Sequence, residues 1–495
     1  MNNKILIFLM IGLLGFTSCS DSLDVINENE PDFKKVYSSG DDVKTVTSGL
    51  YKTFWNSTMS YYGTAMMMAT AADNASCSWG NAGMRDMSWE PRKAWTNTPG
   101  YGYGNNVKYT FDRMYAVINT ASLVLKAMDN GIAIGKDGVD DNMVRAFSRL
   151  NMGIAYGTLA LTFDKAFIVD EKTAIENATV EDATDYTKVA AQALMYLDEA
   201  IALSSNSFTI PSSWMGTSGG VSSTELKKYA SSWAARILAN TPRNSTQLAA
   251  VDWVAVEAYA NAGVTSNFSV IMDGWNDWYQ MSGDYLTYPG WGVVDMYVVN
   301  KMDPILPAHW DDDAYFPAPG KSTNANADKR IQTDFTYLPS NWLRAARGYY
   351  HWSNYRYSRY DDNYSDGTGA MPELMLSEND LYKAEAMVYT NRLTSAASII
   401  NAGTRTTRGQ LPPVAANIDA LKAAIHHERV VEMVITGSGL QFFEMRKRDF
   451  LQAGTPLHFP IPAKTLETFG APQPFYTFGG PEGKDGINGS NGGWR

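Results

Sequence analysis

The chain has few residues of the kinds that build covalent or metal-bound frameworks. Its 495 residues include only two cysteines, Cys19 and Cys77, and five histidines. A disulfide-rich scaffold is therefore excluded, and no zinc-binding spacing occurs. If Cys19 carries a lipid, as argued below, Cys77 has no intramolecular partner and we expect no disulfide. A chain of this length can instead bury a large hydrophobic core.

Long apolar runs and excess positive charge are also lacking. After the first 20 residues, no segment approaches the roughly 20 consecutive apolar residues that a membrane-spanning helix needs. The formal net charge is -11, with a sequence pI ≈ 5.1. This acidic balance argues against nucleic acid or an anionic lipid surface as the main partner.

The first 19 residues resemble a lipoprotein export signal. Lys4 precedes an apolar run over residues 5–16, and Thr17 and Ser18 lead to Cys19. The run is too short to span a bilayer, so a cleaved signal fits it better. We predict that residues 1–18 are removed, that Cys19 is acylated, and that residues 19–40 form a tether. An ordinary secretory peptide with an incidental cysteine is the alternative.

Helical spacing of apolar residues predicts a mostly α-helical protein. The predicted helices cover residues 43–57, 109–128, 140–161, 186–201, 225–240, 374–388, 393–400 and 419–435. The sixth and seventh are joined tightly around Asn391-Arg392, which gives a hairpin of tetratricopeptide size. Between Phe268 and Met371 no period persists, and a loop region this long is usually functional. The last 25 residues or so are expected to wrap the surface as coil.

Aromatic residues are abundant, with 14 Trp and 28 Tyr. They gather in three loop clusters: Trp79, Trp89, Trp95, Tyr101 and Tyr103; then Trp275, Trp278, Tyr279, Tyr288 and Trp291; then Trp310, Trp342, Tyr349, Tyr350, Trp352, Tyr355 and Tyr357. Aromatic faces offer rigid contact area for the apolar faces of sugar rings. Nearby Asn, Asp and Arg side chains can form hydrogen bonds with the sugar hydroxyls: Asn74, Asn81, Asn97, Asn276, Asp277, Asn341 and Arg356. For any single Trp, burial as a loop anchor is the competing interpretation.

Two motifs suggest a metal only weakly. His426-His427-Glu428 are adjacent on a helix and point in different directions, so Glu428, Arg429 and Glu432 are better explained as a structural ion-pair network. Residues 362–373 partly match a calcium loop, but Tyr364 stands at its third ligand position and Pro372-Glu373 fits a helix start. We expect no cofactor and no metal, with calcium at this loop as the alternative.

Several sequence blocks, taken in order, form one recognisable set. They span residues 42–51, 115–121, 145–157, 381–386, 427–432, 437–446 and 460–462. They include Leu-Tyr-Lys-Ala-Glu-Ala at 381–386, His-Glu-Arg-Val-Val-Glu at 427–432 and Pro-Ile-Pro at 460–462. The ordered set resembles the SusD/RagB family of outer-membrane nutrient-binding lipoproteins of Bacteroidetes. Many members end near Gln-Asn-Pro-Gly-Tyr, whereas this chain ends Gly-Ser-Asn-Gly-Gly-Trp-Arg, which leaves the path of the C-terminal coil open.

The resemblance implies a SusD-like domain over residues 41–495, built on tetratricopeptide-like helix pairs with a loop-rich ligand face. Its parts would be an N-terminal helical part (41–265), an aromatic-rich loop region (266–371) and a C-terminal part (372–495). It also implies a lipid-anchored, outer-membrane, surface-facing protein that is not an enzyme. Such proteins capture glycans and pass them to a SusC-like TonB-dependent transporter.

In such proteins the ligand meets the early inter-helix loop and the mid-chain loops. This position favours Trp95, Trp275, Trp278 and Trp291 as ligand contacts, with Asn97, Asn276, Trp310 and Arg356 beside them. Three alternatives stay open, one of which is a purely structural lid with buried aromatics that binds no ligand alone. A peptide-binding, RagB-like member would rely on backbone hydrogen bonds. A glycan hydrolase would need two facing carboxylates, which the sequence cannot place.

Overall fold

A computed structural model describes residues 37–77, 80–173, 179–309, 320–340, 352–480 and 489–495. The predicted signal peptide, Cys19, most of the tether and Trp310 lie outside these residues. No helix in the part of the chain that the structure describes is long and apolar enough to cross a membrane.

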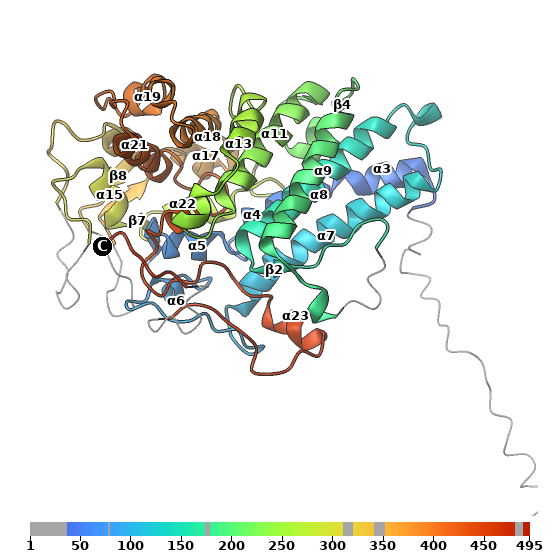
Figure 1. Ribbon diagram of the computed structural model, residues 1–495, viewed down its shortest axis with the longest axis horizontal. Helices are drawn as coiled ribbons and strands as arrows, with labels where there is room; N and C mark the ends of the chain where they lie inside the picture. The colour runs from blue at the N-terminus through green and yellow to red at the C-terminus, as the bar shows by residue number, and fades with distance from the viewer. Residues whose placement is uncertain (1–36, 78–79, 174–178, 310–319, 341–351, 481–488) are drawn as a thin grey trace, which may run out of the picture.

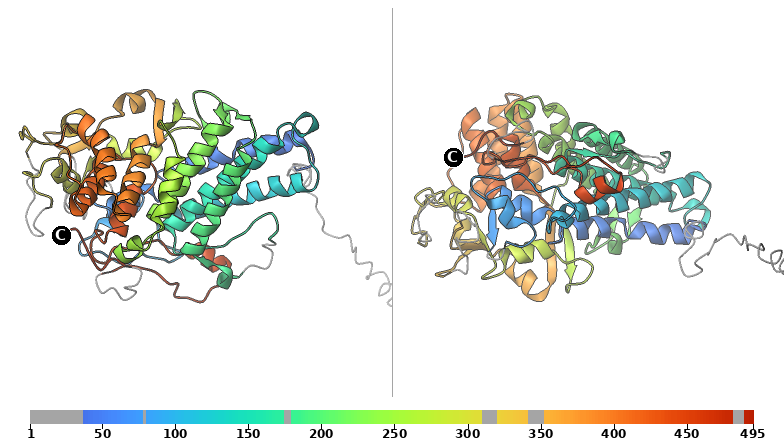
Figure 2. Two further views of the ribbon diagram at one scale, coloured as in Figure 1. Left: turned by 45° about the horizontal axis from the view of Figure 1, so that its top comes forward. Right: turned by 90° about the horizontal axis from the view of Figure 1, so that it is seen from below.

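The molecule is built on a serial array of helices in which each helix packs against the next (Figures 1 and 2). In order, they are α7 (Gly104–Asp129), α8 (Asp141–Thr162), α9 (Tyr186–Leu203), α11 (Ser223–Asn240), α13 (Trp253–Asn261), α18 (Leu376–Tyr389), α19 (Leu393–Ala402) and α21 (Ile418–Val431). The predicted mostly α-helical fold is confirmed, and apart from α13 these helices match the predicted ranges within a few residues.

Small residues set how closely this array packs. Every residue of α8 from Ala146 to Thr162 is buried except Arg149. A Cβ at Gly153 would lie 2.7 Å from Leu197 Cδ2, and one at Gly157 would lie 2.4 Å from Ile237 Cδ1. Because protein interiors are close-packed, these two glycines let α9 and α11 approach α8.

The first predicted helix is two helices, α3 (Gly40–Ser48) and α4 (Leu50–Thr58), which meet at Gly49. The Ser39 side chain caps α3 by accepting a hydrogen bond from the backbone N–H of Asp42. Both helices pack against α7. Apolar periodicity alone does not reveal this break, because the buried face continues from Val43 to Phe54.

The region from Phe268 to Met371 is more ordered than predicted. It contains β6 (Phe268–Asp273), α14 (Met281–Thr287), β7 (Gly292–Val294), α15 (Met296–Met302), α16 (Arg330–Thr333), β8 (Phe335–Tyr337), β9 (Tyr355–Tyr357), α17 (Asp361–Asp366) and β10 (Thr368–Leu374). Strands β6 and β10 pair antiparallel, with Phe268 opposite Leu374 and Asp273 opposite Thr368. This pairing joins the two ends of the region. The prediction that Pro372-Glu373 starts a helix is wrong, since both residues lie in β10.

Shorter elements fill the connections. They are α5 (Ala65–Ala71), β1 (Ala75–Cys77), α6 (Met84–Ser88), η1 (Lys136–Gly138), β2 (Lys165–Ala166), η2 (Val180–Asp182), β3 (Thr184–Asp185), β4 (Thr209–Ile210), α10 (Ser212–Met215), β5 (Val221–Ser222), α12 (Ser245–Ala249), α20 (Thr404–Thr407), α22 (Leu440–Lys447) and α23 (Ala463–Thr468). Besides β6–β10, the antiparallel pairs are β1–β7, β2–β3, β4–β5 and β8–β9.

The C-terminal segment lies along one side of the helical array as extended chain interrupted by α23 (Figure 2). Phe459 binds the end of α8 through both of its backbone groups: its N–H donates to Thr162 O and its carbonyl accepts from Asp164 N. The final residues are also held, because Trp494 Nε1 donates to Asp73 Oδ2 at 2.7 Å and its ring contacts Tyr297. The prediction of a surface-wrapping coil is confirmed for the described residues.

Buried ion pairs join the helices of the C-terminal half. Arg330, on α16, is fully buried and donates to Asp328, Glu428 and Glu432. Arg429, on α21, pairs with Glu385 and Glu444 at 2.7 Å each. The predicted structural ion-pair role of Glu428, Arg429 and Glu432 is confirmed.

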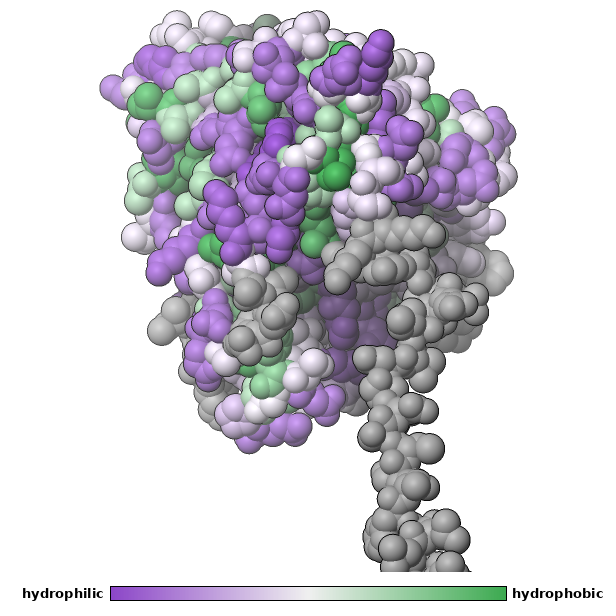
Figure 3. Space-filling model, turned by 90° about the vertical axis from the view of Figure 1, so that its right-hand side faces the viewer, coloured by the Kyte–Doolittle hydropathy of each residue, from purple (hydrophilic) through white to green (hydrophobic). Residues whose placement is uncertain are grey.

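Figure 3 shows the end of the molecule that carries α3 and the α7–α8 turn. Hydrophilic side chains dominate the visible coloured surface there, and apolar side chains are scattered among them. Scattered apolar residues are normal on a protein surface and mark no site.

Candidate functional site

Four of the predicted contact residues are buried. Trp95 is only 4 % exposed and packs edge-on against Tyr101 and Phe459, both at 5.2 Å between ring centroids. Asn97 donates to the backbone oxygens of Ile461 and Tyr476. Both residues therefore hold the C-terminal segment, so neither presents its side chain to a ligand at the surface.

Trp278 and Arg356 also have internal partners. Trp278 packs beside Tyr51, and a Cβ at Gly216 would lie 2.5 Å from its ring. Arg356 binds the Asp361 carboxylate and the backbone oxygen of Thr287. These contacts hold both side chains inside the protein, away from a surface ligand.

Trp275, Asn276 and Trp291 are exposed. Trp310 lies outside the described residues. No ring contact joins Trp275 to Trp291 among the described aromatic pairs, so the two do not form one stacking surface. They flank α14 from the β6–α14 loop and from the α14–β7 turn.

Trp275 is held in an unusual backbone conformation. Its φ is 63°, in the left-handed region that bulky side chains rarely adopt, and its side chain is 57 % exposed. Its ring lies over Gly367, where a Cβ would come within 2.7 Å of the indole. Strain of this kind persists only where the surroundings enforce it, and it clusters at functional sites.

A second group of exposed rings was not predicted as a unit. We define the aromatic strip as Tyr109, Tyr62, Tyr61, Tyr285, Trp291 and Tyr288. Successive ring centroids in this order lie 6.1, 4.3, 6.3, 5.1 and 5.0 Å apart. Three of the rings are strongly exposed: Tyr62 at 54 %, Tyr288 at 49 % and Trp291 at 43 %.

Three separate segments of the chain bring the strip together. Tyr61 and Tyr62 lie between α4 and α5, Tyr109 lies on α7, Tyr285 lies on α14, and the others lie in the α14–β7 turn. That turn is tight: Trp291 N and Gly292 N both donate to Tyr288 O. A Cβ at Gly292 would lie 2.0 Å from Leu286 O, so only glycine fits there.

Polar groups border the strip. Asn81 Nδ2 donates to the Tyr285 hydroxyl at 2.6 Å, and Asn106 Nδ2 donates to Tyr61 O at 3.1 Å. The Tyr61 hydroxyl donates to that of Tyr62, and this hydrogen bond raises the pKa of Tyr61. The strip thus offers ring faces with hydroxyl and amide groups at their edges, which suits a flat, amphipathic ligand.

The aromatic clusters predicted from the sequence contain Tyr288 and Trp291 of the strip. They do not contain Tyr61, Tyr62, Tyr109 and Tyr285. The adjacent pair Tyr61-Tyr62, just before Gly63 in a short connection, was a usable signal. Spacing does not single out Tyr109 or Tyr285, because each shares its helix with other half-buried aromatic or apolar residues, such as Tyr115 on α7 and Met281 on α14.

The metal motifs have internal partners. Asp362 and Asp366 lie on helix α17, and Glu373 points into the core, where it binds Arg236 and Tyr229. Atoms of Asp328, His427 and Glu428 lie within 4.8 Å of one another. The Arg330 guanidinium, however, donates to both carboxylates in that cluster.

Solved structures share this fold. A SusD-like carbohydrate binding protein from Bacteroides fragilis matches with a TM-score of 0.58 and 15% identity, over 83% of this chain and 86% of its own. One from Bacteroides vulgatus gives 0.55 and 17%, over 86% and 85%. A SusD superfamily protein from Bacteroides fragilis gives 0.54 and 14%, over 91% and 95%.

No protein-family model and no curated protein matches the chain by sequence. At these identities the likeness establishes architecture, and it extends over most of both chains. The chain has the SusD-like fold.

Proposed function

We propose that this protein is a lipid-anchored, surface-facing glycan-binding protein of the bacterial outer membrane. It captures oligosaccharide or polysaccharide without cleaving it and delivers it to a SusC-like TonB-dependent transporter. The observation that carries the proposal is the aromatic strip: six neighbouring rings, bordered by amides, on a fold shared with proteins described as carbohydrate binding.

The strip fits a sugar chain for a physical reason. A pyranose ring has apolar C–H faces and polar edges, so it packs on an aromatic face while its hydroxyls meet amides at the side. Tyr and Trp provide this contact area at low entropic cost because they have few rotatable bonds. Trp275, which precedes α14 in the chain and makes no described ring contact with the strip, would then serve as a separate contact.

Affinity electrophoresis of the chain without residues 1–19, against plant, algal, fungal and host polysaccharides, tests the proposal. One polymer should retard the protein. Trp291→Ala should weaken that retardation about tenfold, since losing one stacked ring costs roughly 1–2 kcal/mol. Val254→Ala, which changes an exposed apolar residue on α13, is the control and should change nothing.

The outcomes separate the alternatives. Retardation that survives both Trp291→Ala and Tyr62→Ala would contradict the strip as the binding surface. Binding of a peptide library in place of any polymer would favour a RagB-like peptide binder. Release of reducing ends during incubation would indicate a hydrolase and overturn the proposal.

Anchoring and delivery have their own test. Cys19→Ala should release the protein from outer-membrane fractions, and the wild-type protein should be cut by protease added to intact cells. Co-purification with a TonB-dependent transporter is expected from solubilised membranes. A Cys19→Ala protein that stays in the membrane would contradict lipid anchoring.

A further inference from the structure

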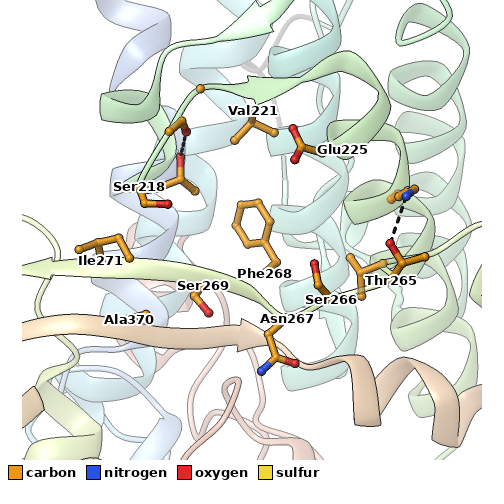
Figure 4. A pocket seen from close by; sticks show the side chains of 15 residues that line it. Ser218, Val221, Glu225, Thr265, Ser266, Asn267, Phe268, Ser269, Ile271 and Ala370 are labelled. Atoms are coloured by element: carbon orange, nitrogen blue, oxygen red, sulfur yellow. Dashed lines mark hydrogen bonds between the residues drawn. The ribbon is translucent and has the colours of Figure 1, made fainter.

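A groove of ≈ 410 Å³ lies between α11, the loop before β5, and the paired strands β6 and β10. It shares no residue with the aromatic strip. Its size falls within the range of small-ligand pockets, which is about 300–1,000 Å³. Phe268, the first residue of β6, stands at its centre (Figure 4).

The Phe268 ring is a rigid floor. Tyr229 packs against it with ring centroids 4.2 Å apart, and Tyr51 meets it edge-on at 6.5 Å. The side chain is nevertheless only half-buried and lines the groove. Tyr229 and Tyr51 fix the ring on one side, and its other side lines the groove. Such a ring is a pre-organised stacking surface, because its side chain loses no rotamer freedom when a ligand binds.

Hydrogen-bonding groups surround this floor. In Figure 4 the hydroxyls of Ser218 and Ser266 and the carboxylate of Glu225 point into the hollow. Glu225 Oε2 caps α11 by accepting from Ser222, whereas no described residue bonds its Oε1 or either serine hydroxyl. Three polar groups are therefore free to meet a ligand around one aromatic face.

The groove is lined by one carboxylate, Glu225, and by one cation, Lys228. The Glu225 carboxylate would repel a carboxylated or sulfated sugar. Lys228, the neighbouring cation, donates to Thr265 Oγ1 at 3.1 Å on the far side of the groove. Neutral hydroxyls suit Glu225, since a carboxylate accepts hydrogen bonds strongly.

We propose that this groove is a second, independent saccharide-binding site, which takes one or two neutral hexose or pentose units stacked on Phe268. The inference rests on the proposed glycan-binding function and adds to it. Two separated sites on one chain would raise avidity for a long polymer by making the second contact intramolecular.

The test counts bound trisaccharides per chain by native mass spectrometry and by calorimetry. The probes are maltotriose, cellotriose, xylotriose and mannotriose, with trigalacturonic acid as the acidic counterpart. Ser266→Trp blocks the groove without removing a core side chain. Ser398→Trp, at another exposed serine on α19, is the matched control, and Phe268→Leu removes the aromatic face but keeps an apolar floor.

For a trisaccharide that binds, the wild-type protein and Ser398→Trp should take two molecules per chain. Ser266→Trp should take one, and Trp291→Ala should take one at the groove while its strip site binds about tenfold more weakly. In the Trp291→Ala background, Phe268→Leu should weaken the remaining site roughly three- to tenfold.

If the wild-type protein binds one trisaccharide per chain, and this binding is weakened in Trp291→Ala but unchanged in Ser266→Trp, the groove site is overturned and the proposed function stays intact. A ratio of one with the reverse pattern would support the groove and contradict the strip. Trigalacturonic acid binding that Ser266→Trp abolishes would overturn the neutral class. If no trisaccharide binds the wild-type protein, the groove inference fails, and the polysaccharide experiment decides the proposed function separately.

Discussion

At the scale of single residues, burial decides which aromatic side chains can contact a ligand. Trp275 and Trp278 are three positions apart, yet one is 57 % exposed and the other 8 %. The sequence predicts that both lie in a loop, but it does not say which of them packs beneath it. Trp95 and Asn97 show the same limit, because the C-terminal segment that covers them lies more than 350 positions away.

A substitution at Gly367 tests whether the conformation of Trp275 depends on the glycine beneath its ring. Gly367→Ala adds a Cβ at φ 65° and against the indole, whereas Gly470→Ala adds one at φ 67° into open space. The backbone cost is about 1 kcal/mol in both. We expect Gly367→Ala to destabilise further and to shift the tryptophan fluorescence, as measured by urea unfolding and emission spectra. Equal losses in the two variants would show that Trp275 does not depend on Gly367.

At the scale of elements, short-range and long-range order differ in how far the sequence predicts them. Helices such as α9 and α11 follow from apolar spacing and from caps, such as Ser222 with Glu225. The β6–β10 pair does not, because its partners are about 100 residues apart and each strand is short. Its pairing depends on tertiary neighbours, as β-propensity usually does.

Arg330 joins α16 to the end of α21 through buried ion pairs with Glu428 and Glu432. Arg330→Met leaves Asp328, Glu428 and Glu432 buried without their shared cation, so we expect a loss of about 3–5 kcal/mol in unfolding free energy. Arg392→Met, which breaks an exposed pair with Glu257, is the control and should change little. Chemical denaturation measures both. Similar losses of unfolding free energy in the two variants would contradict a stabilising role for the Arg330 ion pairs.

At the scale of the whole molecule, buried titratable groups tie stability to pH. His426 is fully enclosed between Tyr297, whose hydroxyl lies 2.6 Å from Nε2, and Glu444, 3.1 Å from Nδ1. Burial lowers the pKa of His426 from 6.5 to about 4, against the opposing effect of Glu444. The unfolded chain therefore binds this proton first, and stability present above pH 6.5 is lost as the pH falls toward 4.

His426→Gln removes this titration while keeping a donor for Glu444 and an acceptor for Tyr297. Between pH 7.5 and pH 4.5, the wild-type protein should lose roughly 2–3 kcal/mol more unfolding free energy than the variant. Asp164, whose pKa burial raises to about 6, acts in the opposite direction but is common to both proteins. Urea unfolding at several pH values measures the difference, and parallel curves would contradict a neutral, buried His426.

The sequence by itself determined the helical class, the positions of most long helices, the hairpin at Asn391-Arg392 and the richness of the mid-chain loops in aromatics. These are local properties, since helix periodicity and caps depend on residues a few positions apart. Tertiary structure alone decided which rings are exposed, how three segments join Tyr61, Tyr109, Tyr285 and Trp291 into one strip, and where the Phe268 groove opens. These features depend on contacts between residues far apart in the chain, and only packing fixes such contacts.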